Sequence, residues 1–499
     1  MLDEVTQIAP NVELDGIDDD ALVHFVPMAA VSENFSGIDV SLLRPLSEVR
    51  KGYTGFVAGD VLLAKITPCM ENGKGGLVPP LPNQVAFGST EFHVLRASAA
   101  VSNSWVASFL SQPAFRKVAR ANMTGTAGQM RVPTKWLRGV DLPVPPCAEQ
   151  TRIVAKLEEL LSDLDTGVAE LKAAQKKLAQ YRQSLLKAAV EGALTAEWRT
   201  QHQPTETGAQ LLQRILQERR ARWEARQLAK FAEQGKTPPK DWQKKYPEPV
   251  QPDTTGLPEL PQGWVWATID QIAQVGTGVT PLRSKSAYFN QGTIPWVTSG
   301  ALNSETVTSA TELVTELALK ECRLELYPVG SLLVAMYGEG KTRGKCSELL
   351  MHATINQAIA AIVLESAAQL SKAFLKAFLL DSYERMRSQA SGGVQPNLNL
   401  QIVKGIVLPL PPHAEQAEIT QLLDGQFDQI SQQQIAVEVS LKQSAAQRQN
   451  ILRAAFSGQL VPQDPADEPA SALLARIRAE RAARDAVKKP RGRKTKDAA

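Results

Sequence analysis

The longest regular alternation of hydrophobic and polar residues in the chain lies between residues 153 and 188. Leucine recurs there every seven residues, and mostly apolar residues fill a second seam position (Leu157, Leu164, Leu171, Leu178 and Leu185; Ile153, Leu160, Gly167, Ala174, Tyr181 and Ala188). An apolar repeat of seven residues with polar residues between is typical of a long helix that packs as a coiled coil. The pattern predicts a helical rod that begins near Pro145 and Pro146, because proline suits a first helical turn.

This block occurs twice. Residues 139–195 align without a gap with residues 405–461, with 19 identities in 57 positions, and each copy opens with Leu-Pro-x-Pro-Pro-x-x-Glu-Gln (Leu142–Gln150 and Leu408–Gln416). The match resumes at Leu211–Ile215 against Leu473–Ile477. The second rod is more polar, with Gln426, Gln433 and Ser444 in seam positions. We expect two rods that pack antiparallel as a spacer; the alternative is two ordinary amphipathic core helices.

The segments before each rod read as mixed α/β. Strand candidates end at residues 64, 87 and 95 in the first segment, and a helix is predicted for Trp105–Val118. Residues 260–411 repeat this order, with strands at 329–335 and 358–364 and a helix at 372–386. Residues 231–262 are rich in proline, glycine and charge and predict a linker. We expect an α+β multidomain chain with a pseudo-two-fold internal repeat, divided at 1–145, 146–259, 260–411 and 412–499.

Composition narrows the class of protein. The formal net charge is only +3 over 499 residues, so any nucleic-acid surface must be local. Two local candidates are the helix around Arg219–Arg222 and the tail from Lys488 to Lys496. The four cysteines are far apart and the five histidines are scattered, which argues against a zinc site or a disulfide framework. No apolar run approaches 18 residues, and we expect a cytoplasmic protein.

The motif that competes most strongly with a binding role is a degenerate P-loop at Ala335–Thr342, which follows a predicted strand. A working P-loop needs a helix directly after it, and Gly344 is a poor helix residue. Glu339-Gly340-Lys341 also spells half of a nuclease signature, but three residues match too easily to decide anything. The Pro-Pro pairs are followed by Cys, His, Leu or Lys, so the loop of an adenine methyltransferase is absent.

The whole plan resembles the specificity subunit of type I restriction–modification enzymes. The residues that carry the resemblance are the two Leu-Pro-x-Pro-Pro-x-x-Glu-Gln blocks, the rods behind them and Leu260-Pro261-Gln262-Gly263-Trp264. The chain departs from the family in lacking a clear Leu-Pro-x-Gly-Trp start to its first domain. The resemblance implies two target-recognition domains, 1–145 and 260–411, which read a bipartite DNA sequence, and two conserved helical regions, 146–259 and 412–499. P-loop ATPase and coiled-coil scaffold remain the alternatives.

The resemblance also implies that the chemistry lies in partners. It implies double-stranded DNA as ligand, two methylation subunits and two restriction or motor subunits, with S-adenosylmethionine, ATP and Mg²⁺ bound by those subunits and no catalytic residue, cofactor or metal in this chain. Base and phosphate contacts need Arg, Lys, Asn and Gln. The candidates are, in the first domain, Lys65, Asn72, Lys74, Asn122, Gln129 and Arg131, and in the second Arg283, Lys285, Lys341, Arg343, Lys345, Gln395, Asn397 and Asn399.

A repeated rod offers two similar docking faces, so we expect one copy of this chain with two methylation subunits. The charged residues that could contribute to those faces are Lys172, Lys176 and Arg182 and, in the second copy, Lys442 and Arg448. The alternative for these charges is simple solvation.

The rod length predicts the spacing of the target. From Ile153 to Ala188 the rod rises about 52 Å at ~1.5 Å per residue, which equals roughly 15 base pairs at ~3.4 Å each. Inserting four residues, about one helical turn, within residues 157–185 should alter the unread gap and leave both half-sites unchanged. Methylation mapping of the variant measures both, and altered half-sites would refute the idea that the rod sets the gap.

Overall fold

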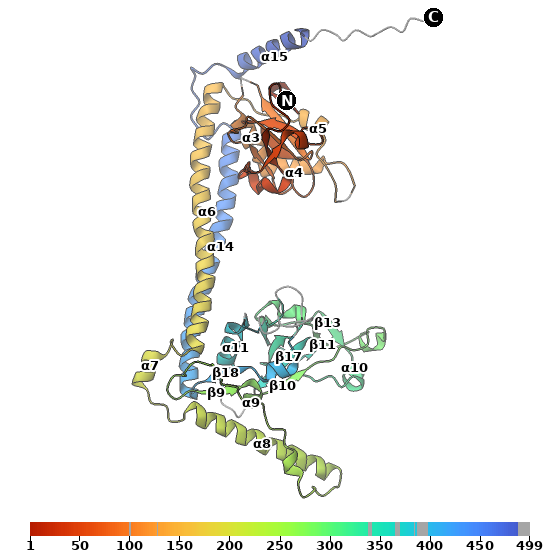
Figure 1. Cartoon of the computed structure of the whole chain (residues 1–499), viewed down its shortest axis with the longest axis vertical. Helices are drawn as coiled ribbons and strands as arrows, with labels where there is room; N and C mark the ends of the chain where they lie inside the picture. Colours follow the sequence, from red (N-terminus) through yellow and green to blue (C-terminus); the bar gives the residue numbers. More distant parts are fainter. Residues whose placement is uncertain are drawn as a thin grey trace, which may run out of the picture. The chain divides into compact units, whose positions relative to one another are not determined.

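The computed structural model describes residues 1–98, 101–126, 128–337, 342–364, 370–383, 385–386 and 398–487. The chain divides into two compact units (Figure 1), which are described separately. Unit 1 comprises residues 1–172 and 437–499, and unit 2 comprises residues 173–436. The chain passes between them in two helices, α6 (Cys147–Val190) and α14 (His413–Phe456). Both have 44 residues and their ends are offset by 266 positions, so the repeat in sequence is a repeat in secondary structure.

Unit 1 contains two four-stranded sheets. One has the order β1-β8-β5-β6 and is antiparallel throughout, with strands Thr6–Ile8, Phe92–Ala97, Val61–Ala64 and Gly75–Leu77. The other has the order β3-β2-β7-β4, with strands Leu43–Pro45, Leu22–Val26, Val85–Gly88 and Thr54–Val57, and its β2–β7 pair is parallel. The central strand β5 is buried along its whole length, as its unbroken apolar run predicts.

Unit 2 repeats part of this topology. Its larger sheet has the order β10-β17-β14-β15-β12, with strands Ala273–Thr277, Ile359–Leu364, Leu332–Ala335, Cys346–Leu349 and Thr306–Val307. The smaller sheet has the order β13-β11-β16, with strands Glu312–Val314, Ile294–Val297 and Thr354–Ile355. Its β13–β11 pair is antiparallel and its β11–β16 pair is parallel, as in the β3-β2-β7 part of the sheet in unit 1. An additional two-stranded sheet pairs β9 (Val265–Thr268) with β18 (Val407–Leu410).

Helices cover these sheets in each unit. In unit 1 these are α1 (Leu2–Val5), α2 (Leu46–Val49), α3 (Asn103–Ser111), α4 (Pro113–Ala121) and α5 (Thr134–Arg138), and α15 (Ala470–Val487) contacts α1. Unit 2 has α7 (Ala196–Gln201), α8 (Gly208–Glu233), α9 (Ile269–Ile272), α10 (Glu316–Glu321), α11 (Lys372–Asp381) and α13 (Leu400–Lys404). Short 3-10 turns η1 to η5 span Met28–Ala30, Glu33–Phe35, Trp242–Lys245, Ser286–Tyr288 and Ser299–Asn303.

The prediction of one helix over Trp105–Val118 was wrong. The structure breaks it between α3 and α4 at Gln112, whose φ of −64° and ψ of 134° are extended. Pro113 follows directly and disfavours a helical conformation for the residue before it. The predicted linker at 231–262 begins too early, because α8 continues to Glu233.

The glutamine of the repeated Glu-Gln pair makes equivalent hydrogen bonds in the two blocks. In unit 1 the Gln150 side chain accepts a hydrogen bond from the Ser102 amide at 3.0 Å, at the start of α3, and donates to the Pro145 carbonyl at 2.9 Å. In unit 2 Gln416 accepts from the Ser371 amide at 2.8 Å, at the start of α11, and donates to the Pro411 carbonyl at 2.9 Å. Each glutamine is almost fully buried and connects the globular segment before it to the start of the long helix.

Glu415 is a buried carboxylate in unit 2 that accepts several hydrogen bonds. Its carboxylate is 1% exposed and accepts hydrogen bonds from Arg199 at 2.7 Å, Thr195 at 2.7 Å and the indole N–H of Trp264 at 2.8 Å. Trp264 belongs to the Leu-Pro-x-Gly-Trp motif, so this motif supplies a donor to the second repeated block. Three donors compensate the cost of burying the charge.

Candidate nucleic-acid interface

Two of the predicted residues of unit 1 meet where strand β5 ends. The chain leaves β5 at Ala64, and the Lys65 carbonyl accepts a hydrogen bond from the Val132 amide at 2.9 Å. Ile66 and Arg131 form an isolated antiparallel bridge. The loop around Gln129 and the loop after β5, which are more than 60 residues apart in sequence, therefore lie side by side.

Hydrogen bonds to Glu91 and Gln129 hold the Arg131 guanidinium group in one orientation at this junction. Its Nη2 donates to Glu91 Oε1 at 2.8 Å and its Nε to Glu91 Oε2 at 3.0 Å, while Nη1 donates to the Gln129 carbonyl at 3.1 Å. The hydrogen bond from Arg131 holds the pKa of Glu91 below its ordinary value. The Arg131 side chain remains 41% exposed. A guanidinium fixed by a two-pronged pair presents its remaining N–H groups in a defined direction, which suits recognition of a planar acceptor.

The other candidates of unit 1 lie on the flanking loops. Lys74 pairs its carbonyl with the Ala64 amide at 2.9 Å, which places it beside Lys65, and its Nζ donates to the Met28 carbonyl at 3.0 Å. Asn72 is exposed and donates to Glu33 at 2.8 Å. Asn122 ends α4 and donates to the Val118 carbonyl of its own helix at 2.9 Å. Lys65, Lys74, Gln129 and Arg131 thus form one group, which we call the β5 loop group.

A buried histidine lies beneath the β5 loop group and makes it sensitive to pH. His93 Nε2 contacts the Val132 carbonyl at 2.9 Å, and burial holds the pKa of His93 below its ordinary value. The folded state therefore favours neutral His93, so its contribution to stability is present above the unfolded pKa of about 6.5 and is lost as pH falls below it. We expect the protection factors of the β8 amides, which are corrected for the intrinsic exchange rate at each pH, to fall between pH 7 and pH 5 more in the wild type than in His93→Gln. An equal fall in both proteins would contradict this assignment.

In unit 2 Arg283 and Lys285 lie together beside the smaller sheet. Arg283 forms an ion pair with Glu312, and its guanidinium lies 5.0 Å from the Trp296 ring centroid. Lys285 Nζ lies 2.6 Å from Glu321 and 4.3 Å from the centroid of Tyr288. The pairing raises the pKa of both cations. Both are surface cations with an acidic partner, like Arg131.

The remaining candidates of unit 2 lie on other loops. Lys345 donates to Asn303 at 2.9 Å, and Arg343 lies two residues before it in the turn that leads to β15. Asn399 is the N-cap of α13, where its side chain accepts from the Ile402 amide at 2.9 Å, so this oxygen has a structural role. Lys341, Gln395 and Asn397 lie outside the described residues.

The P-loop reading of Ala335–Thr342 is not favoured. Part of the motif, 338–341, lies outside the described residues, but the chain after Thr342 forms a turn and then strand β15. A P-loop needs a helix N-terminus at this place to direct amides at phosphate. In the described part of the chain no group of three or more His, Cys, Asp or Glu side chains could hold a metal ion.

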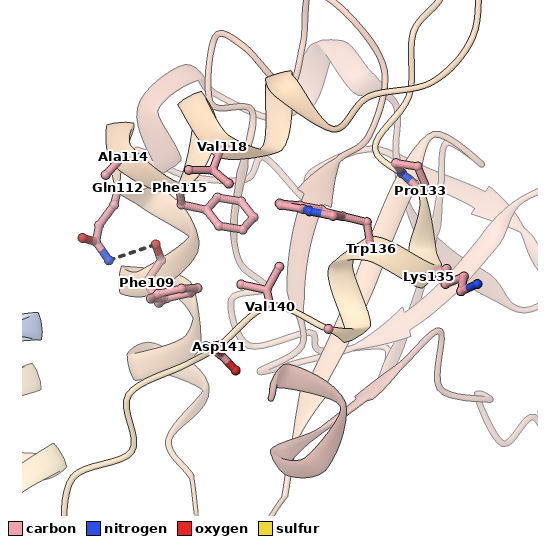
Figure 2. A pocket seen from close by; sticks show the side chains of 11 residues that line it. Phe109, Gln112, Ala114, Phe115, Val118, Pro133, Lys135, Trp136, Val140 and Asp141 are labelled. Carbon is pink, nitrogen blue, oxygen red and sulfur yellow. Dashed lines mark hydrogen bonds between the residues drawn. The ribbon is translucent and has the colours of Figure 1, made fainter.

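Unit 1 also carries an apolar pocket of about 740 Å³. Figure 2 shows Phe115 and Trp136 turned toward each other, with Phe109, Val118 and Val140 around them. Gln112 bonds the Phe109 carbonyl at 3.3 Å, and Lys135 points away from the rings (Figure 2). These lining residues offer hydrophobic contacts rather than an arrangement of side chains suited to catalysis.

The candidates that sequence reasoning missed are the acidic partners. Glu91 lies 40 residues before Arg131, Glu312 lies 29 residues after Arg283, and Glu321 lies 36 residues after Lys285. No local motif marks a carboxylate whose partner is that far away in sequence. Only the pairing of loops in the folded units identifies them.

Comparison with known proteins identifies sequence relatives of this chain. Residues 261–440 match the family model described as the type I restriction modification DNA specificity domain. The chain is 31% identical over 323 residues to the type I restriction enzyme EcoEI specificity subunit of Escherichia coli, which covers 56% of this chain and 51% of that protein. It is 30% identical over 311 residues to the EcoAI specificity subunit of Escherichia coli, with 54% and 50% covered. The matches thus span about half the length of these curated relatives.

A solved structure extends the likeness in fold. A chain from work entitled "Structural basis underlying complex assembly and conformational transition of the type I R-M system" superimposes with a TM-score of 0.67 at 19% identity. The match covers 92% of this chain and 97% of that one. Among the described residues, no helix is both long and apolar enough to cross a membrane.

Proposed function

We propose that the whole chain is the DNA-recognition subunit of a type I restriction–modification complex, since residues 261–440 match the family model of the type I restriction modification DNA specificity domain. In this proposal the chain binds a bipartite DNA sequence and performs no chemistry itself. Partner subunits bound to it carry out adenine-N6 methylation and ATP-dependent cleavage. S-adenosylmethionine, ATP and Mg²⁺ bind to those partners.

The observation that carries the proposal is the duplicated architecture. The order β10-β17-β14-β15 in the larger sheet of unit 2 matches the order β1-β8-β5-β6 in unit 1. In each unit a buried glutamine, Gln150 or Gln416, connects the globular part to a 44-residue helix. Two versions of one scaffold with different loops suit a ligand that has two different halves. We assign the halves to residues 1–145 and 260–411, and the helical regions to 146–259 and 412–499.

In the proposal α6 and α14 form an antiparallel coiled coil. Support comes from contacts inside each unit: Asp165 pairs with Arg448 at 2.6 Å in unit 1, and Tyr181 donates to Gln426 at 3.1 Å in unit 2. As the residue number rises along α6, its partner's number falls along α14, as antiparallel helices require.

The contacts that we propose with DNA are the β5 loop group in unit 1 and Arg283, Lys285, Arg343 and Lys345 in unit 2. All except Gln129 are cations, and Lys65, Lys74, Arg343 and Lys345 are half-buried. Arg131, Arg283 and Lys285 are each paired with an acidic side chain. Cations of this kind supply phosphate contacts and, where the fork of Arg131 reaches a base edge, sequence readout.

The proposed assembly contains one copy of this chain, two methylation subunits and, for cleavage, two motor subunits. Arg182 and Arg448 are used inside the units, by Glu305 and Asp165, so the exposed lysines Lys172, Lys176 and Lys442 are the better candidates for the docking faces. Native mass spectrometry of the co-expressed complex tests the assembly. A dominant species with two copies of this chain and two methylation subunits would contradict it.

A further inference from the structure

Helix α8 of unit 2 begins as part of the core and continues beyond it. Its buried residues are Gly208, Leu211 and Ile215, all within its first eight positions. The Gly208 amide donates to the Gly263 carbonyl at 2.7 Å, and a Cβ at Gly208 would lie 2.3 Å from the Leu410 carbonyl oxygen, so no side chain fits there. The start of α8 is therefore fixed against β9 and β18.

The buried face of α8 becomes cationic where the core ends. Arg219, Arg222, Arg226 and Lys230 follow Ile215 at spacings of three or four residues and so share its face of the helix. Arg219 still packs against unit 2, 3.6 Å from Asp270. From there to Glu233 the helix continues for about 21 Å at ~1.5 Å per residue without a fully buried side chain. We call residues 220–246 the basic arm.

Aromatic stacking folds the end of the basic arm back onto the helix. The Trp242 ring stacks on Trp223 with centroids 5.7 Å apart, and Tyr246 meets the edge of Trp223 at 5.4 Å. Phe231 lies 6.2 Å from Trp242. The return segment then reaches the core, where the Val250 amide donates to Asp270 at 3.1 Å. Asp270 thus contacts Arg219 before the arm and Val250 after it. The arm projects from unit 2 as a closed hairpin (Figure 1).

The basic arm concentrates charge that its own structure does not neutralise. Residues 220–246 contain eight Arg or Lys and three Asp or Glu, a net charge of +5 in a chain whose total is +3. Among the described residues, ion pairs engage Arg220, Arg222 and Lys244 but not five other exposed cations, Arg226, Lys230, Lys236, Lys240 and Lys245. Uncompensated cations held on a structured element repel one another, so a polyanion stabilises the arrangement.

We propose that the basic arm binds the phosphate backbone of duplex DNA without regard to sequence, as a contact separate from the two recognition domains. The choice of duplex DNA as the polyanion rests on the proposed function. Four of the five cations without an ion pair are Lys, whose point charge attracts the phosphates of any sequence, so the arm adds affinity rather than specificity. Trp223, on which the aromatic residues of the arm pack, corresponds to Asp485 in the second copy of the repeat.

The test is the salt dependence of binding to a random-sequence duplex. The full chain is compared with a variant in which the five cations become glutamine (Arg226→Gln, Lys230→Gln, Lys236→Gln, Lys240→Gln and Lys245→Gln). Removing one phosphate interaction reduces the slope of log K against log salt by about 0.9, so the loss of five cations should make the slope shallower by up to about 4.5. A matched control changes the four lysines to arginine, keeps the charge and should retain the wild-type slope.

Two outcomes would overturn the inference. One is an unchanged slope in the glutamine variant, which would indicate that the arm binds an acidic protein and not DNA. The other is an equally shallow slope in the arginine control, which would assign the effect to a disturbed fold. Because the probe has random sequence, the result does not depend on sequence preference. A wild-type chain that shows the slope but no preference for any target would refute the proposed function and not the arm.

Discussion

Replacing residues 1–141 with the matching segment of a related specificity subunit should change one half of the recognised sequence completely and leave the other half unaltered. The physical reason is that the loops which differ between the units, including the β5 loop group, are built within one unit, whereas Gln150 and the start of α6 stay with the host chain. Methylation mapping of cells that carry the chimera measures both halves. Changes in both halves would mean that the two domains read DNA jointly.

The chimera must preserve the donor to Gln150. The Ser102 amide that binds this glutamine is contributed by the exchanged segment, as is the Trp105 indole that donates to the Pro143 carbonyl at 2.8 Å. A control exchange of 1–141 for a segment from the same specificity class should leave both half-sites as they were. This control distinguishes a change in the recognised DNA sequence from damage to the junction between the exchanged segment and the host chain.

Glu415→Ala should be the most destabilising single substitution in unit 2. It leaves the Arg199 guanidinium, the Thr195 hydroxyl and the Trp264 indole N–H without their buried acceptor. Removing one partner of a buried, hydrogen-bonded ion pair costs about 3–5 kcal/mol. Denaturant unfolding followed by tryptophan fluorescence measures the decrease in stability. Asp424→Ala, an exposed acid on the same helix, is the matched control and should change stability by less than about 0.5 kcal/mol.

Glu415→Gln should fall between the wild type and Glu415→Ala, because the amide oxygen still accepts from Trp264 while the charge that balances Arg199 is absent. A Glu415→Ala variant as stable as the Asp424→Ala control would refute the view that this carboxylate organises unit 2.

The long helices could be predicted from sequence because their pattern is local and periodic. The rod predicted to begin near Pro145 and Pro146 is helix α6, which begins at Cys147, and its repeat is α14 with the same length. The strands around β5, β8, β14 and β17 were likewise predicted by short apolar runs bounded by turns. The break at Gln112 could have been predicted as well, since Pro113 stands in the sequence.

The orientation of the site could not be predicted in this way. Lys65 and Arg131 were named separately, but their meeting depends on the backbone pairing of Lys65 with Val132 across 67 residues. Glu91, which orients Arg131, carries no local signal. The repeated Glu-Gln pair was visible, but the role of Gln150 and Gln416 as ties to α3 and α11 depends on long-range hydrogen bonds.

Genome-wide mapping of methyladenine in cells with and without this chain, expressed beside the proposed methylation subunit, tests DNA recognition by this chain. We expect one bipartite motif, with two short specific halves separated by an unread gap, that disappears when the chain is deleted and returns when it is restored. A methylation pattern that does not change on deletion, or a motif that is continuous without a gap, would contradict it.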